Sequence, residues 1–338
     1  MLAGWERQQR SRMLRPTTIS SGVALVRRVR EHAEAWPWEW AADDLEDFFS
    51  DLASAPLNRR PATLRNYQCQ LRGFLAFLVD ERYPWRTVCG GCFDRVPVQL
   101  LDERNLIVHV SDWEGDPRRR AMTRSELEAF FEFCDRRVAG RRALRRKGSL
   151  AALRDGALFK VAYAWGLRRT ELIRLDTYDL LRNPRQPRFG GYGIVRVRYG
   201  KRSRGSAPKR RDVLTVWSWA AEVLAQYVEE IRPLYGFDQQ PALWPTERGG
   251  RLAVRYVDER FAELRDELGL DRAHTPHSLR HSYITHLHEE KVDPLLVKEQ
   301  VGHRYMSTTA LYTAVSSDYK QSALAAALEE QLGRMRGV

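Results

Sequence analysis

Residues 275–281 read Thr-Pro-His-Ser-Leu-Arg-His and open a stretch of helical periodicity that continues to Glu290. His277 and Arg280 are three residues apart, so a helix brings both side chains to one face. A second stretch, residues 164–172, reads Ala-Trp-Gly-Leu-Arg-Arg-Thr-Glu-Leu and places Arg168 just after a glycine at a predicted helix start. Backbone amides at such a start attract anions, and a guanidinium adds a bidentate clamp. The two stretches together indicate a site for an anionic substrate.

Three further residues follow the same chain order. Lys201 comes after a glycine in a basic hairpin, His303 comes after a glycine that ends a helical pattern, and Tyr312 ends the sequence Thr-Thr-Ala-Leu-Tyr. From His277 onward, the successive intervals in the set are 3, 23 and 9 residues. Each short box alone occurs by chance in unrelated proteins, but six positions in order make a specific signal.

With these boxes the chain resembles the tyrosine recombinases, or phage integrase family, which includes the Xer-type recombinases. The resemblance covers about residues 120 to 325 and extends loosely over the N-terminal half. It implies an N-terminal helical core-binding domain of the SAM-like kind and a mixed α+β catalytic domain. It also implies the catalytic residues Arg168, Lys201, His277, Arg280, His303 and Tyr312.

The activity that the resemblance implies is cleavage and rejoining of DNA strands through a 3′-phosphotyrosyl intermediate, without metal, ATP or another cofactor. Arg168 and Arg280 would clamp the non-bridging phosphate oxygens as negative charge develops on them. Tyr312 would be the nucleophile. Because a phenol has an ordinary pKa of about 10, it needs a base at neutral pH, and His277 is the candidate.

Three more polar residues receive roles in the same scheme. Lys201 would protonate the leaving 5′ oxygen, and His303 would hydrogen-bond the phosphate. Glu171, three residues after Arg168, would orient an arginine or lysine rather than react.

Neighbours of the same residue type compete for three of these roles: Arg169, Lys209, and the tyrosines Tyr305 and Tyr319. The Gly-Leu-Arg register favours Arg168, and the Gly-Lys pair at the end of a predicted strand favours Lys201. Only Tyr312 follows the Thr-Thr-x-x-Tyr pattern. The insert at 202–208 is longer than the compact Xer-type turn.

The charge of the chain independently indicates an anionic partner. The 338 residues carry a formal net charge of +12, and all but 7 of the 56 cations are Arg. Two runs without a carboxylate, residues 136–147 and 196–211, hold seven and eight of them. Cations near phosphates release condensed counterions, which gives salt-dependent affinity for any nucleic acid sequence. A solvated surface, and codon usage for the Arg excess, are the alternatives; two runs in one chain favour DNA or RNA.

Domain organisation follows from a break in the helical pattern at residues 112–120. Asp116-Pro117 and the arginines after it read as a linker, and Thr123-Arg-Ser-Glu126 reads as a capping box that opens a new helix. We therefore expect a DNA-binding domain at 1–116 and a catalytic domain at 117–338. The residues expected to contact DNA are Arg65, Arg118, Arg119, Arg120, Arg202, Arg204, Lys209 and Arg210.

The expected fold is mostly α with a small β-hairpin or sheet. Apolar residues recur at helical spacing in 18–35, 45–52 and 61–78, which predicts a basic helical bundle in the first half. In the second half, alternation at 194–199 and 212–216 predicts the two strands of a hairpin, among helices. The segment 319–335 is expected to be a helix that contacts a neighbouring protomer.

Metal-binding interpretations are weaker. His277 and His281 have a spacing that zinc can use, but Arg280 lies between them. Cys89-Gly-Gly-Cys92 is half of a zinc site, with His109 as a third ligand and no evident fourth. Structural zinc normally takes four ligands, so packed or loop cysteines are favoured and no metal site is predicted.

Other protein classes fit the sequence poorly. No apolar run approaches the ~18 residues that span a bilayer, and the Arg-rich start lacks the apolar core of a secretory signal. Four cysteines do not make a disulfide scaffold. We therefore expect a cytoplasmic, nucleoid-associated protein without a membrane partner.

The expected function is site-specific DNA recombination, as the integrase of a mobile element. The partners would be double-stranded DNA at attachment or crossover sites, further copies of the chain in a synaptic tetramer, and an accessory directionality factor. A type IB-like topoisomerase and a catalytically silent DNA-binding regulator are the alternatives.

Overall fold

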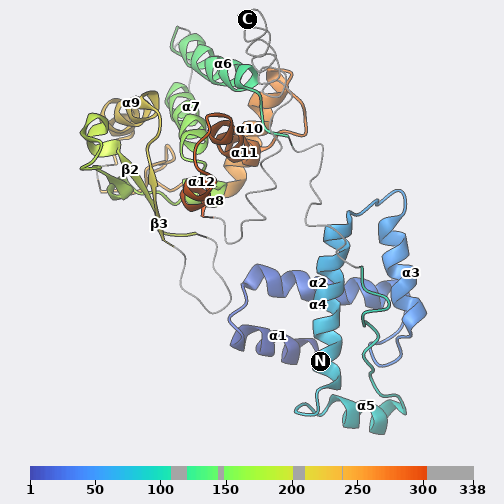
Figure 1. Ribbon diagram of the computed structural model, residues 1–338. Coiled ribbons are helices and arrows are strands. Elements are labelled where there is room, and N and C mark those ends of the chain that lie inside the picture. The colour runs from blue at the N-terminus through green and yellow to red at the C-terminus, as the bar shows by residue number, and fades with distance from the viewer. Residues whose placement is uncertain (108–119, 144–147, 201–209, 238, 303–338) are drawn as a thin grey trace, which may run out of the picture. The chain divides into compact units, whose positions relative to one another are not determined.

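The computed structural model describes residues 1–107, 120–143, 148–200, 210–237 and 239–302, with only the backbone for 140–143. These residues form two compact units, one within 1–107 and the other within 120–302 (Figure 1). The predicted boundary near residue 117 lies outside the described residues. No helix of the described ranges is long and apolar enough to cross a membrane.

The first unit is a bundle of five helices. They are α1 Leu2–Ser11, α2 Pro16–Ala33, α3 Ala42–Ala53, α4 Pro61–Val79 and α5 Trp85–Phe93. Val23, Val26 and Val29 of α2 are buried at three-residue spacing, as their pattern predicts. The Trp5 ring of α1 packs edge-on against Phe74 of α4, 5.1 Å between centroids. The predicted helices at 18–35, 45–52 and 61–78 are confirmed as α2, α3 and α4.

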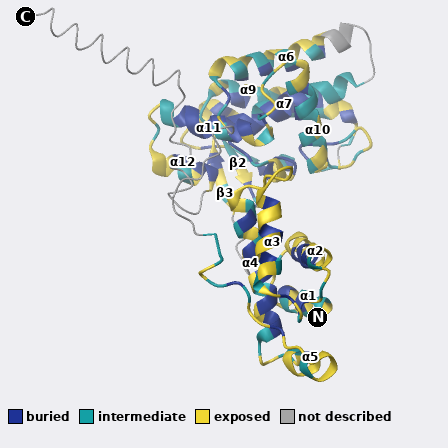
Figure 2. Cartoon of the chain, turned by 90° about the vertical axis from the view of Figure 1, so that its right-hand side faces the viewer, coloured by how far each residue is buried: buried dark blue, intermediate teal, exposed yellow. Residues whose placement is uncertain are grey.

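The second unit holds seven α-helices within its described part. They are α6 Arg124–Ala143, α7 Ser149–Ala164, α8 Arg169–Leu172, α9 Ser218–Gln226, α10 Val254–Glu267, α11 Pro276–Glu289 and α12 Pro294–Val301. Helix α7 and helix α11 are the most buried of them, and they pack against each other (Figure 2). Because α11 is buried along most of its length, the residues at its exposed N-terminus have a rigid support.

A three-stranded antiparallel sheet in the order β1-β2-β3 lies beside these helices. The strands are β1 Leu180–Leu181, β2 Ile194–Val197 and β3 Arg211–Leu214, with Val195 opposite Val213 and Arg196 opposite Asp212. The valines face the core and the charged pair faces outward. The predicted hairpin is confirmed, and β1 is an addition that its two residues could not signal.

The capping box predicted at the start of α6 is present. The Thr123 amide donates to the Glu126 carboxylate at 2.8 Å, and the Glu126 amide donates to the Thr123 hydroxyl at 3.1 Å. Helix α5 was not expected, because its Cys-Gly-Gly-Cys sequence has poor helix propensity. Within α5, Cys89 is fully buried and Cys92 is exposed.

Candidate active site

Arg168 is placed by a tight turn between α7 and α8. Gly166 adopts a positive φ of 54°, and a Cβ on this residue would lie 2.4 Å from Cδ1 of Tyr283 on α11. Only glycine fits a left-handed backbone this close to an aromatic ring. The turn that precedes Arg168 therefore packs directly against α11, the helix that carries His277 and Arg280.

Glu171 holds the Arg168 side chain. Its carboxylate accepts the Arg168 amide at 3.0 Å and Nη1 of the same residue at 2.7 Å. It also accepts both Nη atoms of Arg211, the first residue of β3, at 3.0 and 2.8 Å. Burial raises the pKa of this carboxyl, but the Arg211 hydrogen bonds and the charges of Arg211, Arg168 and Arg280 outweigh it and lower the pKa to about 2. Glu171 is thus ionised and joins two arginines, as its predicted orienting role requires.

Arg280, in the second turn of α11, joins three segments through hydrogen bonds. Its side chain is 1% exposed, and its two Nη atoms donate to the carbonyls of Gly166 and Val301, each at 2.6 Å. Gly166 belongs to the α7–α8 turn, and Val301 is the last residue of α12. The guanidinium therefore joins the first arginine box to the end of the helix that precedes His303.

Arg168 and His277 line one open groove. The same groove is bordered by α8, α10 and α11 through Arg168, Thr170, Phe261, Ala262, His277 and His281. His277 is exposed at the N-terminal turn of α11, and the Arg168 side chain is one-quarter exposed. Two residues from distant boxes of the sequence thus share a surface that a phosphate can reach.

Other predicted site residues lie outside the described part of the chain. They are Lys201, His303 and Tyr312 among the catalytic candidates, Arg118, Arg119, Arg202, Arg204 and Lys209 among the DNA contacts, and His109. The segment 319–335 is outside it as well. Of the six catalytic candidates, the structure therefore brings Arg168 and His277 to one groove, and it buries Arg280 between the Gly166 turn and the end of α12.

Three predicted DNA contacts can be placed. Arg65 is half-buried on α4, and Arg210 is exposed just before β3. Both Nη atoms of Arg120 bind the Glu126 carboxylate at 2.5 Å, so this guanidinium is ion-paired with the first turn of α6.

Arg211 is the site residue that the sequence did not single out. Besides Glu171, it binds the main-chain carbonyl of Gln300 through Nε at 2.9 Å. The only hint in the sequence was Glu171, because a buried carboxylate needs several hydrogen-bond donors. Nothing in a run of basic residues says which one supplies them.

The competing arginine has a different partner. Arg169 also borders the groove, where it is ion-paired with Asp258 of α10, whereas Arg168 is held by Glu171. Among the described residues no three His, Cys, Asp or Glu side chains converge as a metal site would require.

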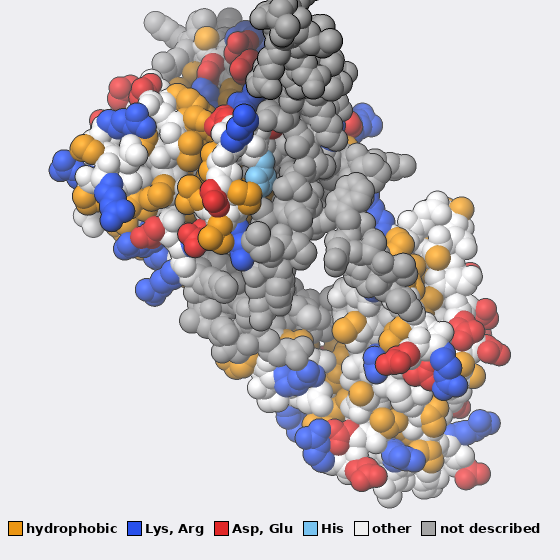
Figure 3. Space-filling view, in the orientation of Figure 1, with side chains coloured by type: hydrophobic (Ala, Val, Ile, Leu, Met, Phe, Trp, Pro, Cys, Tyr) orange, Lys and Arg blue, Asp and Glu red, His pale blue; other side chains and the backbone are white. Residues whose placement is uncertain are grey.

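The described members of the two basic runs are largely paired with carboxylates. Arg137 binds Glu263 and Glu267, Arg196 binds Asp212, and Arg136 binds Glu132. On the face seen in Figure 3, basic and acidic side chains are interspersed over each unit. The runs are therefore less uniformly positive in the fold than in the sequence.

The chain matches the sequence profile of the phage integrase family over residues 120–318. It is 30% identical over 301 residues to the tyrosine recombinase XerD of Caulobacter vibrioides, covering 88% of this chain and 83% of that protein. It is 36% identical over 166 residues to the tyrosine recombinase XerC of Chromohalobacter salexigens, covering 49% of this chain and about half of that protein. The chain therefore belongs to the phage integrase family, the tyrosine recombinases.

Solved structures share the fold. XerH site-specific recombinase bound to its palindromic difH substrate, in a post-cleavage complex, matches with a TM-score of 0.63 and 21% identity over 88% of this chain and 75% of that one. A lambda integrase tetramer bound to a Holliday junction matches with a TM-score of 0.62 and 13% identity over 92% of this chain and 75% of that one.

Proposed function

We propose that this chain is a site-specific DNA recombinase that breaks and rejoins strands through a covalent tyrosine intermediate. The observation that carries the proposal is the groove that Arg168 and His277 both line, although they are more than 100 residues apart in sequence. Glu171 fixes the Arg168 side chain, and Arg280 fixes the Gly166 turn that precedes it. Family membership supplies the class of reaction.

In the proposed cleavage step, the Tyr312 oxygen attacks the scissile phosphorus while His277 accepts the phenolic proton. The bond from phosphorus to the 5′ oxygen breaks, and that oxygen leaves with the electron pair and takes a proton from Lys201. Arg168 and Arg280 stabilise the added negative charge, and His303 hydrogen-bonds the phosphate. The product is a 3′-phosphotyrosyl bond and a free 5′-hydroxyl.

Rejoining is the reverse reaction with a different strand. The 5′-hydroxyl of the partner strand attacks phosphorus and gives its proton to Lys201. The bond from phosphorus to the Tyr312 oxygen breaks, and that oxygen takes back its proton from His277. Because the phosphodiester energy is kept in the protein–DNA bond, the cycle needs no ATP and no metal.

We further propose double-stranded DNA and other copies of the chain as partners, with a mobile element as the biological setting and the cytoplasm, on the nucleoid, as the location. The lambda integrase tetramer on a junction supports a tetrameric synapse. Residues 1–116 would be the core-binding domain, and residues 319–335 would contact the next protomer. An accessory directionality factor would bias the reaction. The predicted phosphate contacts remain Arg65, Arg118, Arg119, Arg120, Arg202, Arg204, Lys209 and Arg210.

A nicked suicide substrate tests this function. Cleavage next to the nick releases a short oligonucleotide, so the covalent complex cannot reverse and accumulates on a denaturing gel. We expect wild-type protein to form the adduct and Tyr312→Phe to form none, because phenylalanine has no oxygen to attack with. Tyr319→Phe is the matched control and should retain the adduct. An adduct that survives Tyr312→Phe would show that another residue is the nucleophile.

Two further assays separate the alternatives. Relaxation of supercoiled DNA without exchange between two sites would identify a type IB-like topoisomerase. A gel shift with no covalent product would identify a silent DNA-binding regulator.

A further inference from the structure

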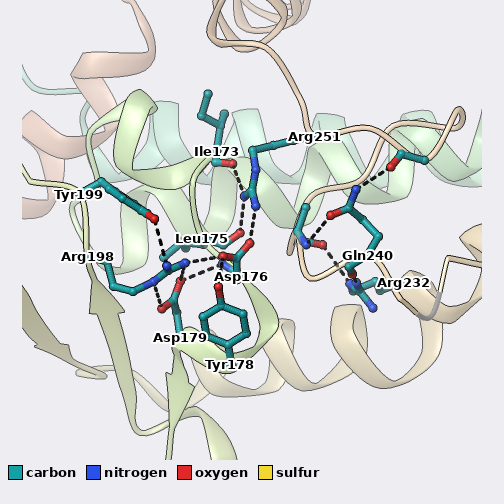
Figure 4. Close-up of polar contacts among 12 residues, drawn as sticks. Ile173, Leu175, Asp176, Tyr178, Asp179, Arg198, Tyr199, Arg232, Gln240 and Arg251 are labelled. Atoms are coloured by element: carbon teal, nitrogen blue, oxygen red, sulfur yellow. Dashed lines mark hydrogen bonds and ion pairs between the residues drawn. The ribbon is translucent and has the colours of Figure 1, made fainter.

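The end of β2 is held by an arginine placed between two buried carboxylates (Figure 4). Arg198 directly follows the strand, and its Nε and Nη2 donate to the Asp179 carboxylate at 2.6 and 2.9 Å. Nη2 also binds Asp176. Asp176 and Asp179 are 5% and 1% exposed. Contacts to two carboxylates, one of them bidentate, restrict both the position and the orientation of the guanidinium.

The two carboxylates are themselves fixed to the segment that follows α8. The Asp176 amide donates to Asp179 at 2.9 Å, and the Tyr178 hydroxyl donates to Asp176 at 2.7 Å. Arg251 binds Asp176 and donates to the carbonyls of Ile173 and Leu175, each at 2.9 Å. The segment that holds Arg198 is therefore rigid, and it begins at Ile173, directly after the helix that carries Glu171.

Two tyrosine rings flank the guanidinium. The Arg198 Cζ atom lies 4.8 Å from the ring centre of Tyr178 and 4.9 Å from that of Tyr199. Both rings are substantially exposed, at 58% and 41%. The Arg198 side chain between them is only 20% exposed, and cation–π attraction to the rings helps to keep it in place.

Burying these three charged groups costs desolvation free energy, although the strand that they hold, β2, is short. Removing two carboxylates and an arginine from water offsets most of the attraction between them, so such clusters add little net stability. What they do provide is a fixed geometry. By contrast, Arg196 on the same strand pairs with Asp212 across the sheet with 46% and 42% of the side chains exposed. An exposed pair of this kind constrains the strand far less.

The returning arm of the hairpin is tied to the same segment. Arg211 opens β3 and binds Glu171. The outgoing arm is therefore fixed to Asp176 and Asp179, and the returning arm to Glu171, all within residues 168–179. Both anchors connect the hairpin to the frame that holds Arg168.

We infer that Arg198, Asp176 and Asp179 form a positioning clamp for leaving-group protonation: they hold the base of the basic hairpin in register with Arg168. This inference rests on the proposed function. The candidate general acid, Lys201, follows Arg198 by three residues in the sequence. A clamp at the base sets where the general acid can reach, so its loss should impair protonation of the 5′ oxygen more than attack by the tyrosine.

A change of leaving group tests this directly. When sulfur replaces the bridging 5′ oxygen, the group leaves as a thiolate, because a thiol has a pKa of about 8.5, far below that of an alcohol. Cleavage of that substrate needs no proton. We expect Arg198→Lys, which keeps the charge but loses the fork, to slow single-turnover cleavage of ordinary DNA about 10- to 100-fold. The same variant should cleave the sulfur-containing substrate within about 3-fold of the wild-type rate, since only protonation is impaired.

Arg196→Lys is the matched control, on the same strand and also paired with a carboxylate, and it should cleave both substrates at near wild-type rates. If Arg198→Lys slows both substrates equally, or neither, the clamp has no part in protonation and the inference is wrong. Should Arg198→Lys fail to fold, Asp179→Asn loosens the same contact and carries the same two expectations. Wild-type protein that forms an adduct with neither substrate would instead overturn the proposed function, and the clamp with it.

Discussion

At the scale of single residues, the placement of Arg168 depends on Gly166. The backbone turns there with a positive φ, directly against the ring of Tyr283, and the Gly166 carbonyl accepts Nη1 of Arg280. Gly166 thus provides the backbone conformation, the close contact and the hydrogen bond. Together these hold the segment that carries Arg168 against α11, the helix that carries Arg280.

Gly166→Ala should destabilise the protein more than Gly236→Ala. Both glycines have a positive φ, 54° and 71°, so each alanine is forced into a left-handed backbone at a cost of about 1 kcal/mol. Only at Gly166 would the new methyl also collide with Tyr283, whereas nothing lies within 4 Å at Gly236. We expect a loss of about 2–4 kcal/mol in unfolding free energy at Gly166, by overpacking, measured by urea denaturation. Equal losses in the two variants would show that the close contact is relieved without cost.

The sequence was sufficient to predict some residues at and around the groove but not others. Arg168, His277 and Arg280 carry recognisable spacing, and the orienting role expected of Glu171 agrees with its contacts to two arginines. Arg211 could not be chosen, because its partner is 40 residues away and its neighbours in the sequence are also basic. Ion-pair partners of this kind are set by tertiary structure, which local pattern does not reveal.

At the scale of elements, the segment before α6 docks on α11. Met122 is fully buried; its amide donates to the Ser282 hydroxyl at 2.8 Å, and its carbonyl lies 3.1 Å from Nε2 of His286. Nδ1 of the same histidine lies 2.9 Å from the Tyr163 hydroxyl on α7. The entry of the chain into the second unit is thus fixed to the helix that presents His277.

This contact predicts a pH dependence of stability. Burial lowers the pKa of His286, and likewise of His281, to about 4. The unfolded chain takes up these protons near pH 6.5 and the folded chain only near pH 4, so the unfolding free energy falls as pH drops through that window. Each histidine accounts for up to about 3 kcal/mol of the loss.

His286→Gln should reduce that loss. Glutamine can still donate to the Met122 carbonyl and accept from Tyr163 but binds no proton. We expect a shallower fall in unfolding free energy between pH 7 and pH 4, measured by denaturant titration at several pH values. An unchanged pH profile would mean that His286 is not protonated on unfolding in this range.

Most elements of the fold were predictable because their apolar spacing survives in the structure. Helices α2, α3, α4 and α11 lie where the periodicity places them. Helix α5 and strand β1 were missed for opposite reasons: α5 contains two glycines, and β1 has two residues. Both are stabilised by neighbouring segments rather than by local propensity.

At the scale of the whole molecule, the net charge of +12 overstates how many cations are available to bind DNA. Several cations of the basic runs are paired with carboxylates, so fewer of them can release counterions from DNA than the sequence count suggests. Arg210 differs: it is exposed, and no ion pair joins it to another residue of the described ranges. We therefore expect the described arginines to contribute unequally to DNA affinity.

Salt dependence should reveal this inequality. Arg210→Gln should lower the slope of log affinity against log salt by about 1, as the loss of one phosphate contact does. Arg137→Gln is the matched control, because Glu263 and Glu267 already bind that side chain, and it should leave the slope almost unchanged. A gel-shift or anisotropy series from low to physiological salt measures both. Similar slopes for the two variants would contradict the assignment of Arg210 to the DNA backbone.

The central claim is that the groove of Arg168 and His277 serves a tyrosine that becomes covalently joined to DNA. The most direct measurement is to trap the adduct on a suicide substrate, digest it, and identify by mass spectrometry the peptide that carries the nucleotide. The account predicts a 3′-phosphoryl link to Tyr312, and no adduct when Arg168 is replaced by Ala. A link to any other residue, or an undiminished adduct with Arg168→Ala, would contradict it.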